Sequence, residues 1–370
     1  MLLTVLTPSR LNPIADVFGP RSIAAVRVLR ISVTDRCNLR CVYCMPTQGV
    51  RWLPQKHLLT DDEIVEVVSA AVSVHGIRRF KLSGGEPTVR PQLVQLVQKL
   101  RNVSGVDELS MTSNGMLLAP IARPLADAGM DRVTLSLDSL RPDRFTRITR
   151  GGDIATLFRA IEAVERSGMR NLKLNVVAMR AVNDDEFADF ARLSVANNLT
   201  VRFIEFMPLG DAAIMHADPI SVSASEQGPA GGCGARQRDD AALVVESEIR
   251  SRIEQQLGSL IPINRDAESG VGPSVVYRLA KGNPRGRIGF ISAMSKPFCD
   301  SCNRLRLTAD GILRSCLFDG GEVDVRGILR PSRNRSARKH AISRAMADCV
   351  RLKPQMHTAH GDAPMSRIGG

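Results

Sequence analysis

Three cysteines early in the chain have a spacing that suits a metal cluster. Cys37, Cys41 and Cys44 are separated by three and then by two residues. A structural zinc site takes four ligands, often as two pairs, and a ferredoxin-type cluster takes four thiolates. Three thiolates in one short loop can instead hold three irons of a [4Fe–4S] cluster and leave the fourth iron open to a substrate or cofactor. The spacing favours a catalytic cluster, with a zinc or disulfide loop as the alternative.

A second group of cysteines comes late in the chain. Cys299 and Cys302 are separated by two residues, and Cys316 follows after thirteen more. This group again offers three thiolates, and with Cys349 as a fourth ligand it would suit zinc. Cys233 stands alone among loop-forming residues and is not expected to be a ligand. Such tight groups indicate metal ligands rather than disulfides.

Polar residues occupy strand positions where a buried parallel strand should be apolar. Lys81 and Lys173 have polar neighbours at alternate positions, and Arg304 and Arg306 alternate in the same way. The other alternating residues are Ser83, Thr112, Asn114, Ser136, Asp138 and Asn175. Alternate residues of a strand share a face, so we expect these side chains in one interior, where a phosphate chain would offset the buried cations. The alternative partners are carboxylates of the chain itself, namely Glu86, Asp138 and Glu205.

Two adjacent glycines follow one of these strands. The stretch Ser83-Gly84-Gly85-Glu86-Pro87 lets the backbone approach a ligand closely, and its N–H and C=O groups can pair with the zwitterionic end of an amino acid. A plain strand-to-helix turn is the alternative.

The intervening segments alternate between strand and helix patterns. Strands are expected at 26–33, 79–82, 109–112, 132–137, 172–179 and 201–207, and helices at 61–74, 93–100, 121–128, 155–166 and 185–196. Six such repeats predict an α/β fold with a parallel sheet that curls into an incomplete (βα)6 barrel of the TIM type, with its site at the carboxyl ends of the strands. A helix at 248–257 and strands at 275–279 and 287–291 are expected in a smaller C-terminal region that carries the second cysteine group.

Four parts of the chain are therefore expected. They are an N-terminal arm at 1–25, the partial barrel at 26–210, a linker or insertion at 211–246, and the C-terminal region at 247–370.

The composition limits the class of protein. The chain has 370 residues, a net charge of +12 and only 4% aromatic residues. The charge suits an anionic ligand such as a triphosphate, and the few aromatic residues argue against a stacking platform for single-stranded nucleic acid. Residues 326–344 contain seven Lys and Arg and no Asp or Glu, and we interpret this run as a solvated face over a cluster or a triphosphate entrance. We recognise no secretion signal and no apolar run of membrane length, and expect a cytoplasmic protein.

The first cysteine group, the strand before it and the glycine turn together resemble the radical S-adenosylmethionine (SAM) superfamily. Further stretches resemble one family of that superfamily, the GTP 3′,8-cyclases of molybdenum cofactor biosynthesis. These stretches are residues 29–37, 81–87, 134–140, 202–210 and 297–306.

The resemblance implies a role for each matching residue. Cys37, Cys41 and Cys44 would hold the cluster that binds SAM, and Tyr43, Gly85, Ser136 and Met207 would contact SAM. The residues expected to contact GTP are Arg30, Lys81, Thr112, Lys173, Arg304 and Arg306. Cys299, Cys302 and Cys316 would hold a second [4Fe–4S] cluster whose open iron meets the guanine base. Gly369 and Gly370 match the Gly-Gly tail that reaches the active site in this family, and with Arg304 and Arg306 they are the expected catalytic residues.

The resemblance also implies a reaction. A 5′-deoxyadenosyl radical would abstract hydrogen from C3′ of GTP, and the C3′ radical would attack C8 of guanine to give 3′,8-cyclo-7,8-dihydro-GTP. The implied partners are an electron donor and a downstream cyclic pyranopterin monophosphate synthase, without nucleic acid or a membrane, and a homodimer is one assembly that the resemblance allows.

Two segments depart from the family pattern. Residues 211–246 match it poorly, and the segment at 357–370 is shorter than usual, which bears on whether Gly369 and Gly370 reach the site. One alternative function is that of another radical SAM enzyme with an auxiliary cluster. The other is an iron–sulfur redox sensor that binds nucleic acid through its basic run, with an affinity that falls steeply with salt.

Overall fold

Six parallel strands and the helices between them form the first half of the protein. The computed structural model describes residues 19–209, 242–264, 272–281, 285–330, 334–358 and 365–368. The strands are β1 (Val28–Ser32), β2 (Arg79–Ser83), β3 (Glu108–Ser113), β4 (Arg132–Ser136), β5 (Lys173–Ala178) and β6 (Thr200–Glu205). They pair in sequence order and in parallel. The predicted strand–helix repeat is therefore confirmed.

The helices follow the strands at the predicted places. They are α2 (Asp61–His75), α3 (Leu93–Arg101), α4 (Ala122–Asp127), α5 (Pro142–Thr149), α6 (Ile154–Ser167) and α7 (Phe187–Asn197), of which α5 was not expected. Local sequence fixes their ends. Thr60 and Glu63 form a capping box at the start of α2, and Gly76 ends that helix in the left-handed conformation.

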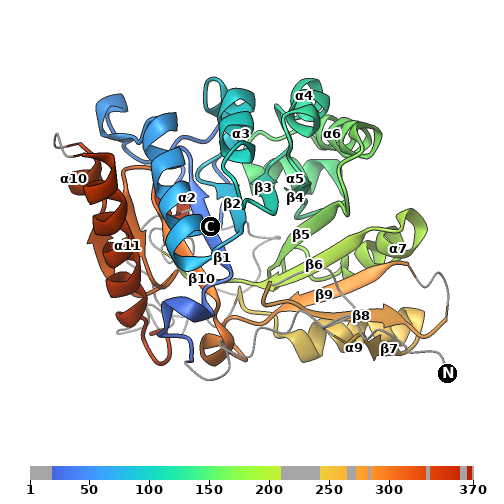
Figure 1. The fold of residues 1–370 in the computed structure, drawn as a ribbon. Helices are drawn as coiled ribbons and strands as arrows, with labels where there is room; N and C mark the ends of the chain where they lie inside the picture. Colours follow the sequence, from blue (N-terminus) through green and yellow to red (C-terminus); the bar gives the residue numbers. More distant parts are fainter. Residues whose placement is uncertain are drawn as a thin grey trace, which may run out of the picture.

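The C-terminal strands join the same sheet at both of its edges, which the expectation of a separate smaller region did not foresee. β10 (Arg304–Leu307) pairs in parallel with β1, and β9 (Arg287–Ile291) pairs in parallel with β6. Antiparallel strands continue each edge. Beyond β10 lie β11 (Ile312–Arg314) and then β12 (Glu322–Asp324), and beyond β9 lie β8 (Val275–Leu279) and then β7 (Leu260–Pro262). Figure 1 shows the two C-terminal groups of strands on either side of the N-terminal ones. Within the described ranges the sheet is open, with β12 and β7 as its edges.

The two faces of the sheet have different chemistry. Leu29 and Ile31 of β1 are fully buried in the same apolar cluster as Ile64 and Val67 of α2. Because side chains alternate along a strand, Arg30 lies on the opposite face. The helices thus cover one face, and the polar strand residues predicted above are left on the other.

The described part of the basic run at 326–344 packs on the helical face, with Arg330, Arg335 and Arg344 exposed, so the predicted solvated face is confirmed. Its predicted place over a cluster or a triphosphate entrance is wrong for these residues, because none of them lines the cavity. Most of its described part forms α11 (Arg335–Arg351), which lies beside α2 in Figure 1. Arg330 contacts Glu63 at 3.0 Å, and Arg338 contacts Glu66 at 2.8 Å. These cations are paired with carboxylates of the helical layer, which the sequence pattern could not show.

The expected division into four parts stays a prediction. Most of the arm at 1–25 and of the linker at 211–246 lies outside the described residues, as does Cys233. The described part of the C-terminal region also includes α9 (Glu246–Leu257), close to the predicted helix at 248–257. Among the described helices, none combines the length and the apolar character that crossing a membrane requires.

Candidate active site

A cavity of about 360 Å³ lies on the polar face of the sheet, between the two cysteine groups. It brings together every described residue that the sequence singled out for a ligand. These residues are Arg30, Cys37, Cys41, Tyr43, Cys44, Lys81, Gly85, Thr112, Ser136, Lys173, Met207, Cys299, Cys302, Arg304, Arg306 and Cys316. Gly369 and Gly370 lie outside the described residues. None of the described residues at 326–344 lines the cavity.

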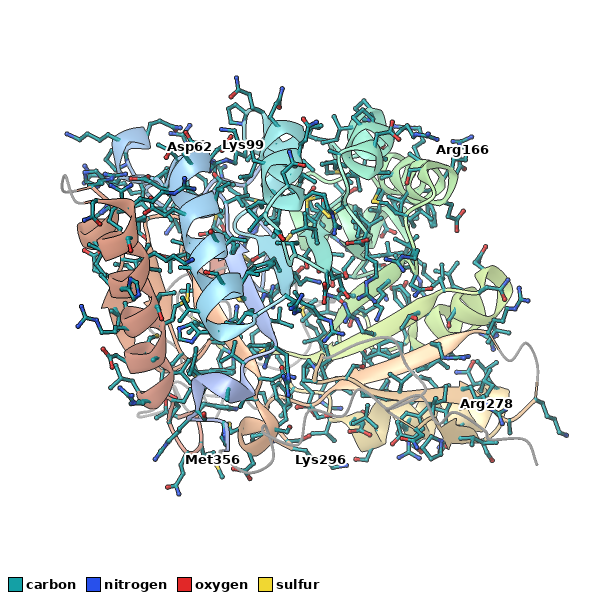
Figure 2. The ribbon with its side chains drawn as sticks, in the orientation of Figure 1. Asp62, Lys99, Arg166, Arg278, Lys296 and Met356 are labelled. Atoms are coloured by element: carbon teal, nitrogen blue, oxygen red, sulfur yellow. The ribbon has the colours of Figure 1, made fainter. Side chains whose placement is uncertain are left out.

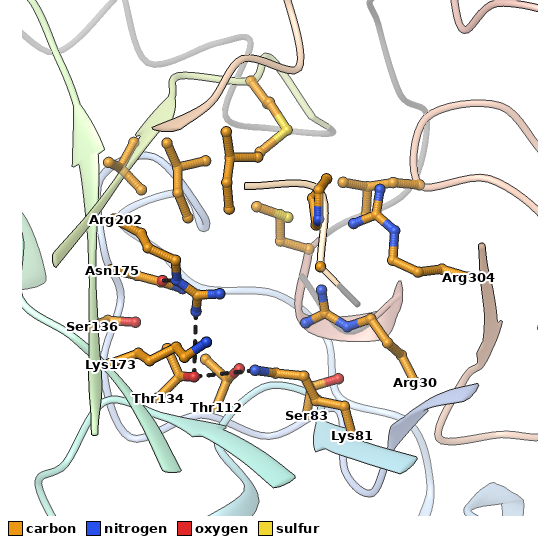
Figure 3. A pocket seen from close by; sticks show the side chains of 18 of the residues that line it. Arg30, Lys81, Ser83, Thr112, Thr134, Ser136, Lys173, Asn175, Arg202 and Arg304 are labelled. Atoms are coloured by element: carbon orange, nitrogen blue, oxygen red, sulfur yellow. Dashed lines mark hydrogen bonds between the residues drawn. The ribbon is translucent and has the colours of Figure 1, made fainter. Parts of the chain in front are cut away.

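Strand register sets the basic residues side by side. Arg30 pairs in register with Lys81 of β2 and with Arg306 of β10. On neighbouring strands Lys173 pairs with Thr134, and Asn175 pairs with both Ser136 and Arg202. Figure 3 shows Arg30, Lys81, Lys173, Arg202 and Arg304 pointing into one common space.

Sequence reasoning missed Arg202 as a site residue, although its face could have been derived. Arg202 lines the cavity, and its guanidinium donates to Asn175 Oδ1 at 3.0 Å and to Thr134 Oγ1 at 3.3 Å. Its position beside Asn175 follows from the same alternation that grouped Lys173 with Asn175. Gly289 stands opposite Arg202 on β9, where a Cβ would meet Arg202 Cγ at 3.0 Å, so the glycine leaves room for this side chain.

The cavity holds mutually repelling cations. Burial, followed by the charges of Arg202 and Arg30, holds the pKa of Lys81 well below its ordinary value. Burial and then Arg304 and Arg202 lower the pKa of Arg30 to about 9, and burial and then Arg132 lower that of Arg202 to about 10. Such a cavity is adapted to a multiply charged anion, which would relieve both the burial and the repulsion.

The carboxylates that were considered as alternative partners are engaged elsewhere. Glu86 accepts from Ser113 Oγ at 2.7 Å and from the Asn114 backbone N–H at 2.6 Å. Glu205 accepts from the backbone N–H groups of Met294 and Ser295. Lys81 instead donates to Thr134 Oγ1 at 3.2 Å. An internal salt bridge to Lys81 is therefore not the explanation of its burial.

The two glycines of the turn at 83–87 allow close contact with the backbone of the first cysteine loop. The N–H of Gly85 donates to Thr34 O at 2.8 Å, and the N–H of Glu86 donates to Arg36 O at 2.8 Å. A Cβ at Gly85 would overlap the carbonyl of Arg36, and one at Gly84, where φ is 142°, would overlap that of Thr34. The turn thus braces the start of the first cysteine loop. Next to it, Ser83 Oγ is buried in the cavity wall and has no hydrogen-bond partner among the described groups. Buried hydroxyls usually have a partner, so this oxygen is available to bind a polar ligand.

The first cysteine group fits an iron–sulfur cluster. Cys37, Cys41 and Cys44 are all free thiols on the cavity wall. Burial raises the pKa of Cys37 to about 11 and that of Cys44 to about 12, so a bound metal is needed to hold them as thiolates. Among the described residues, no three His, Cys, Asp or Glu side chains are already gathered around a single metal-ion position.

Two neighbours orient this loop. Asn114 Nδ2 lies 3.9 Å from Cys37 Sγ and donates to Asn38 Oδ1 at 2.9 Å. The Tyr43 hydroxyl donates to Asp138 at 2.8 Å, and burial raises the pKa of that carboxyl to about 6.

The second cysteine group has a more positive environment. Burial alone would raise the pKa of Cys302, but Arg304 and Lys353 outweigh it and lower that pKa below its ordinary value. Cys299 and Cys316 also line the cavity as free thiols. Cys349, the proposed fourth zinc ligand, is buried and donates to Gly321 O at 3.1 Å, so it is used in packing α11.

The last described residues, 365–368, reach the cavity. Arg306 Nη1 donates to the carbonyl of Ile368 at 3.4 Å, and Met365 lines the cavity. Both belong to the short helix α12 (Met365–Ile368), which immediately precedes Gly369. The shortness of the final segment therefore does not keep Ile368 away from the arginines.

Comparisons with known proteins agree with this geometry. Residues 31–194 match the Radical SAM superfamily, and residues 220–359 match Molybdenum Cofactor Synthesis C. The chain is 41% identical over 349 residues to the GTP 3′,8-cyclase of Pelotomaculum thermopropionicum, covering 93% of this chain and 98% of the relative. It is 38% identical over 332 residues to the GTP 3′,8-cyclase of Pseudomonas entomophila, covering 90% of each.

Among solved structures, SuiB of Streptococcus suis bound to S-adenosylmethionine has a similar fold. The TM-score is 0.50 at 12% identity, over 85% of this chain and 66% of that one.

Proposed function

Because the chain belongs to the GTP 3′,8-cyclase family of radical SAM enzymes, we propose that its cavity converts GTP to (8S)-3′,8-cyclo-7,8-dihydroguanosine 5′-triphosphate. This is the first step of molybdenum cofactor biosynthesis. The observation that carries the proposal is the row of cations, Arg306, Arg30 and Lys81, set in register between two groups of three cysteines.

The two ends of GTP are assigned by charge. Arg30, Lys81, Lys173 and Arg202 would bind the triphosphate, with Thr112 and Thr134 as hydroxyl donors among them. Phosphate oxygens are the natural ligands of converging guanidinium and ammonium groups. Arg304 and Arg306 would hold the nucleotide from the side of the second cysteine group, and Gly369 and Gly370 would follow Ile368 into the same space.

The cofactors are assigned to the cysteine groups. Cys37, Cys41 and Cys44 would hold a [4Fe–4S] cluster, with Tyr43, Gly85, Ser136 and Met207 around SAM. When both are bound, the cluster would supply one electron to SAM, whose C–S bond would break to give methionine and the 5′-deoxyadenosyl radical. Cys299, Cys302 and Cys316 would hold the second [4Fe–4S] cluster. The residues of the chain contribute by holding C3′ of the ribose near that radical and by excluding water and other hydrogen donors.

Several partners and a location are part of the proposal. The reaction needs an electron donor, and its product would pass to a cyclic pyranopterin monophosphate synthase. A homodimer and the division at residues 25, 210 and 246 are retained as proposals. Two groups of free thiols suit a reducing compartment, which supports a cytoplasmic location.

The test is an anaerobic SAM-cleavage assay. The protein is reconstituted with iron and sulfide, given SAM and dithionite, and 5′-deoxyadenosine is measured with and without GTP. We expect a GTP-dependent rise that is lost in Cys299→Ala. Cleavage of SAM that is indifferent to GTP would keep the radical chemistry and remove the substrate assignment.

A further inference from the structure

Lys353 is a buried cation outside the row that faces the nucleotide. It follows the end of α11 and is only 5% exposed. Its Nζ donates to the backbone carbonyl of Cys302 at 3.0 Å. Its own carbonyl accepts from Arg21 Nε at 2.9 Å, so the residue is tied down on both sides. Lys353 is not among the residues that line the cavity.

The charge of Lys353 has no carboxylate partner within the described residues. Burial lowers the pKa of Lys353, whereas the charge of Cys302 raises it, and Arg304, Cys316 and Cys349 act more weakly. The nearby carboxylate of Glu322 is paired with Arg314 at 2.9 Å. A buried ammonium is stabilised by an anion nearby, and the anionic groups closest to Lys353 are the thiolates of the second cysteine group with whatever they bind.

The fixed placement of Lys353 depends on the packing of α11. Cys349 in the last turn donates to Gly321 O, and a Cβ at Gly321 would meet Leu352 Cβ at 2.9 Å. This close packing holds the end of the helix on the loop that follows Cys316. Lys353 therefore cannot swing out to solvent without unpacking that helix end.

We propose that Lys353 compensates the negative charge of the second cluster and raises its reduction potential. The inference rests on the second cluster of the proposed function. A [4Fe–4S] core with three thiolates becomes more negative by one charge when it accepts an electron, here from dithionite, and no proton is needed. A fixed positive charge beside the ligand Cys302 stabilises the reduced form more than the oxidised form. Lys353 acts on the cluster as a positioning and charge-compensating residue and does not contact the nucleotide.

The test isolates the second cluster. In a chain with Cys37, Cys41 and Cys44 all changed to Ala, iron and sulfide are counted and the potential is measured by a redox titration followed by electron paramagnetic resonance. Lys353→Met in this background should lower the equilibrium constant for reduction at least tenfold, which is about 59 mV for a one-electron couple. Lys353→Arg should restore most of the potential, because it keeps the charge.

A matched control is available close by in the sequence. Lys296 precedes Cys299 by three residues, but its side chain is 67% exposed and lies 3.8 Å from Glu246. Figure 2 shows it at the outer edge of the molecule. Lys296→Met should leave the potential unchanged, because solvent and the nearby carboxylate screen this charge.

The outcomes separate the two proposals. If the triple-alanine background binds no iron, the second cluster itself is refuted. If Lys353→Met keeps its iron and its potential, only the role of Lys353 is refuted. If Lys353→Met loses its iron, the same titration is made in Lys353→Gln, which keeps a donor. Loss of iron there as well would make Lys353 a structural residue and overturn the inference.

Discussion

Arg202→Met is expected to stabilise the protein without ligands while weakening its affinity for GTP. The pKa of Arg202 falls from 12.5 to about 10 in the folded state, chiefly through burial and then through Arg132. A cation whose folded pKa lies below its unfolded value destabilises the fold at every pH below the folded pKa. At neutral pH the full penalty is present, and it is relieved only as the pH rises past about 10.

The size of the effect follows from that pKa. A shift of this size corresponds to ~3 kcal/mol at ~1.4 kcal/mol per pKa unit. Arg202 is only half-buried, so solvent screening reduces this by about half, and two lost hydrogen bonds to Asn175 and Thr134 remove a further fraction. We expect the free energy of unfolding of the cluster-free Arg202→Met protein to rise by ~1 kcal/mol. In the loaded protein the lost charge-assisted contact should weaken GTP binding by roughly 10- to 100-fold.

Urea unfolding and calorimetric titration with GTP measure the two halves of this prediction. Arg166→Met is the matched control, since Arg166 is exposed on α6 and, among the described residues, forms an ion pair with Glu162 at 3.2 Å. Its position at the surface is seen in Figure 2. It should change stability by less than ~0.5 kcal/mol and leave GTP binding intact. A destabilised Arg202→Met protein with unchanged GTP affinity would falsify the idea of a repelling cation cluster built for an anion.

Three further predictions concern the cysteine loops and their support. Gly85→Ala should lose the iron of the first cysteine group and keep that of the second, because the added Cβ would overlap Arg36 O. The iron content per chain measures this loss, and an iron content equal to that of the unmodified protein would contradict the prediction. Cys299→Ser should lose about half of the bound iron while Cys349→Ser keeps it all, since only Cys299 is expected to be a ligand. Equal losses of iron in the two variants would support Cys349 as a fourth ligand of the second group. The contribution of Asp138 to stability should decline as the pH rises from about 4 to about 6, by up to ~3 kcal/mol, because burial raises its folded pKa from 3.8 to about 6. Urea unfolding of Asp138→Asn should lack that decline, and an identical pH profile would refute it.

Local sequence patterns predicted much of the site. The spacing of Cys37, Cys41 and Cys44 and the alternation of Lys173 with Asn175 are both short-range signals, and the structure brings these residues into one cavity. Parallel pairing of β4 with β5 then places Ser136 beside Asn175, two residues that strand alternation had already assigned to the same face. Arg202 was within reach of the same argument.

Long-range contacts were beyond the sequence pattern. Nothing local indicates that β10 pairs with β1, or that Arg338 of the basic helix α11 forms an ion pair with Glu66 of α2. Lys353 is a single lysine after a helix, and its nearness to Cys302 depends on how that helix packs. Pairing partners distant in sequence are chosen by tertiary packing, which periodicity alone does not encode.

The arrangement of the sheet also has a consequence for synthesis of the chain. β1 is made early, but one of its two neighbours, β10, is made near the end: Val28 pairs with Arg304. Until then the N-terminal edge of the parallel sheet presents unpaired backbone groups to other chains, an opening for aggregation. The capture of β10 must close a very long loop, so we expect it to be a late and slow step of folding. Expression at high rates, or truncation before Arg304, should therefore lead to edge-to-edge aggregation even though every cysteine of the first group is present.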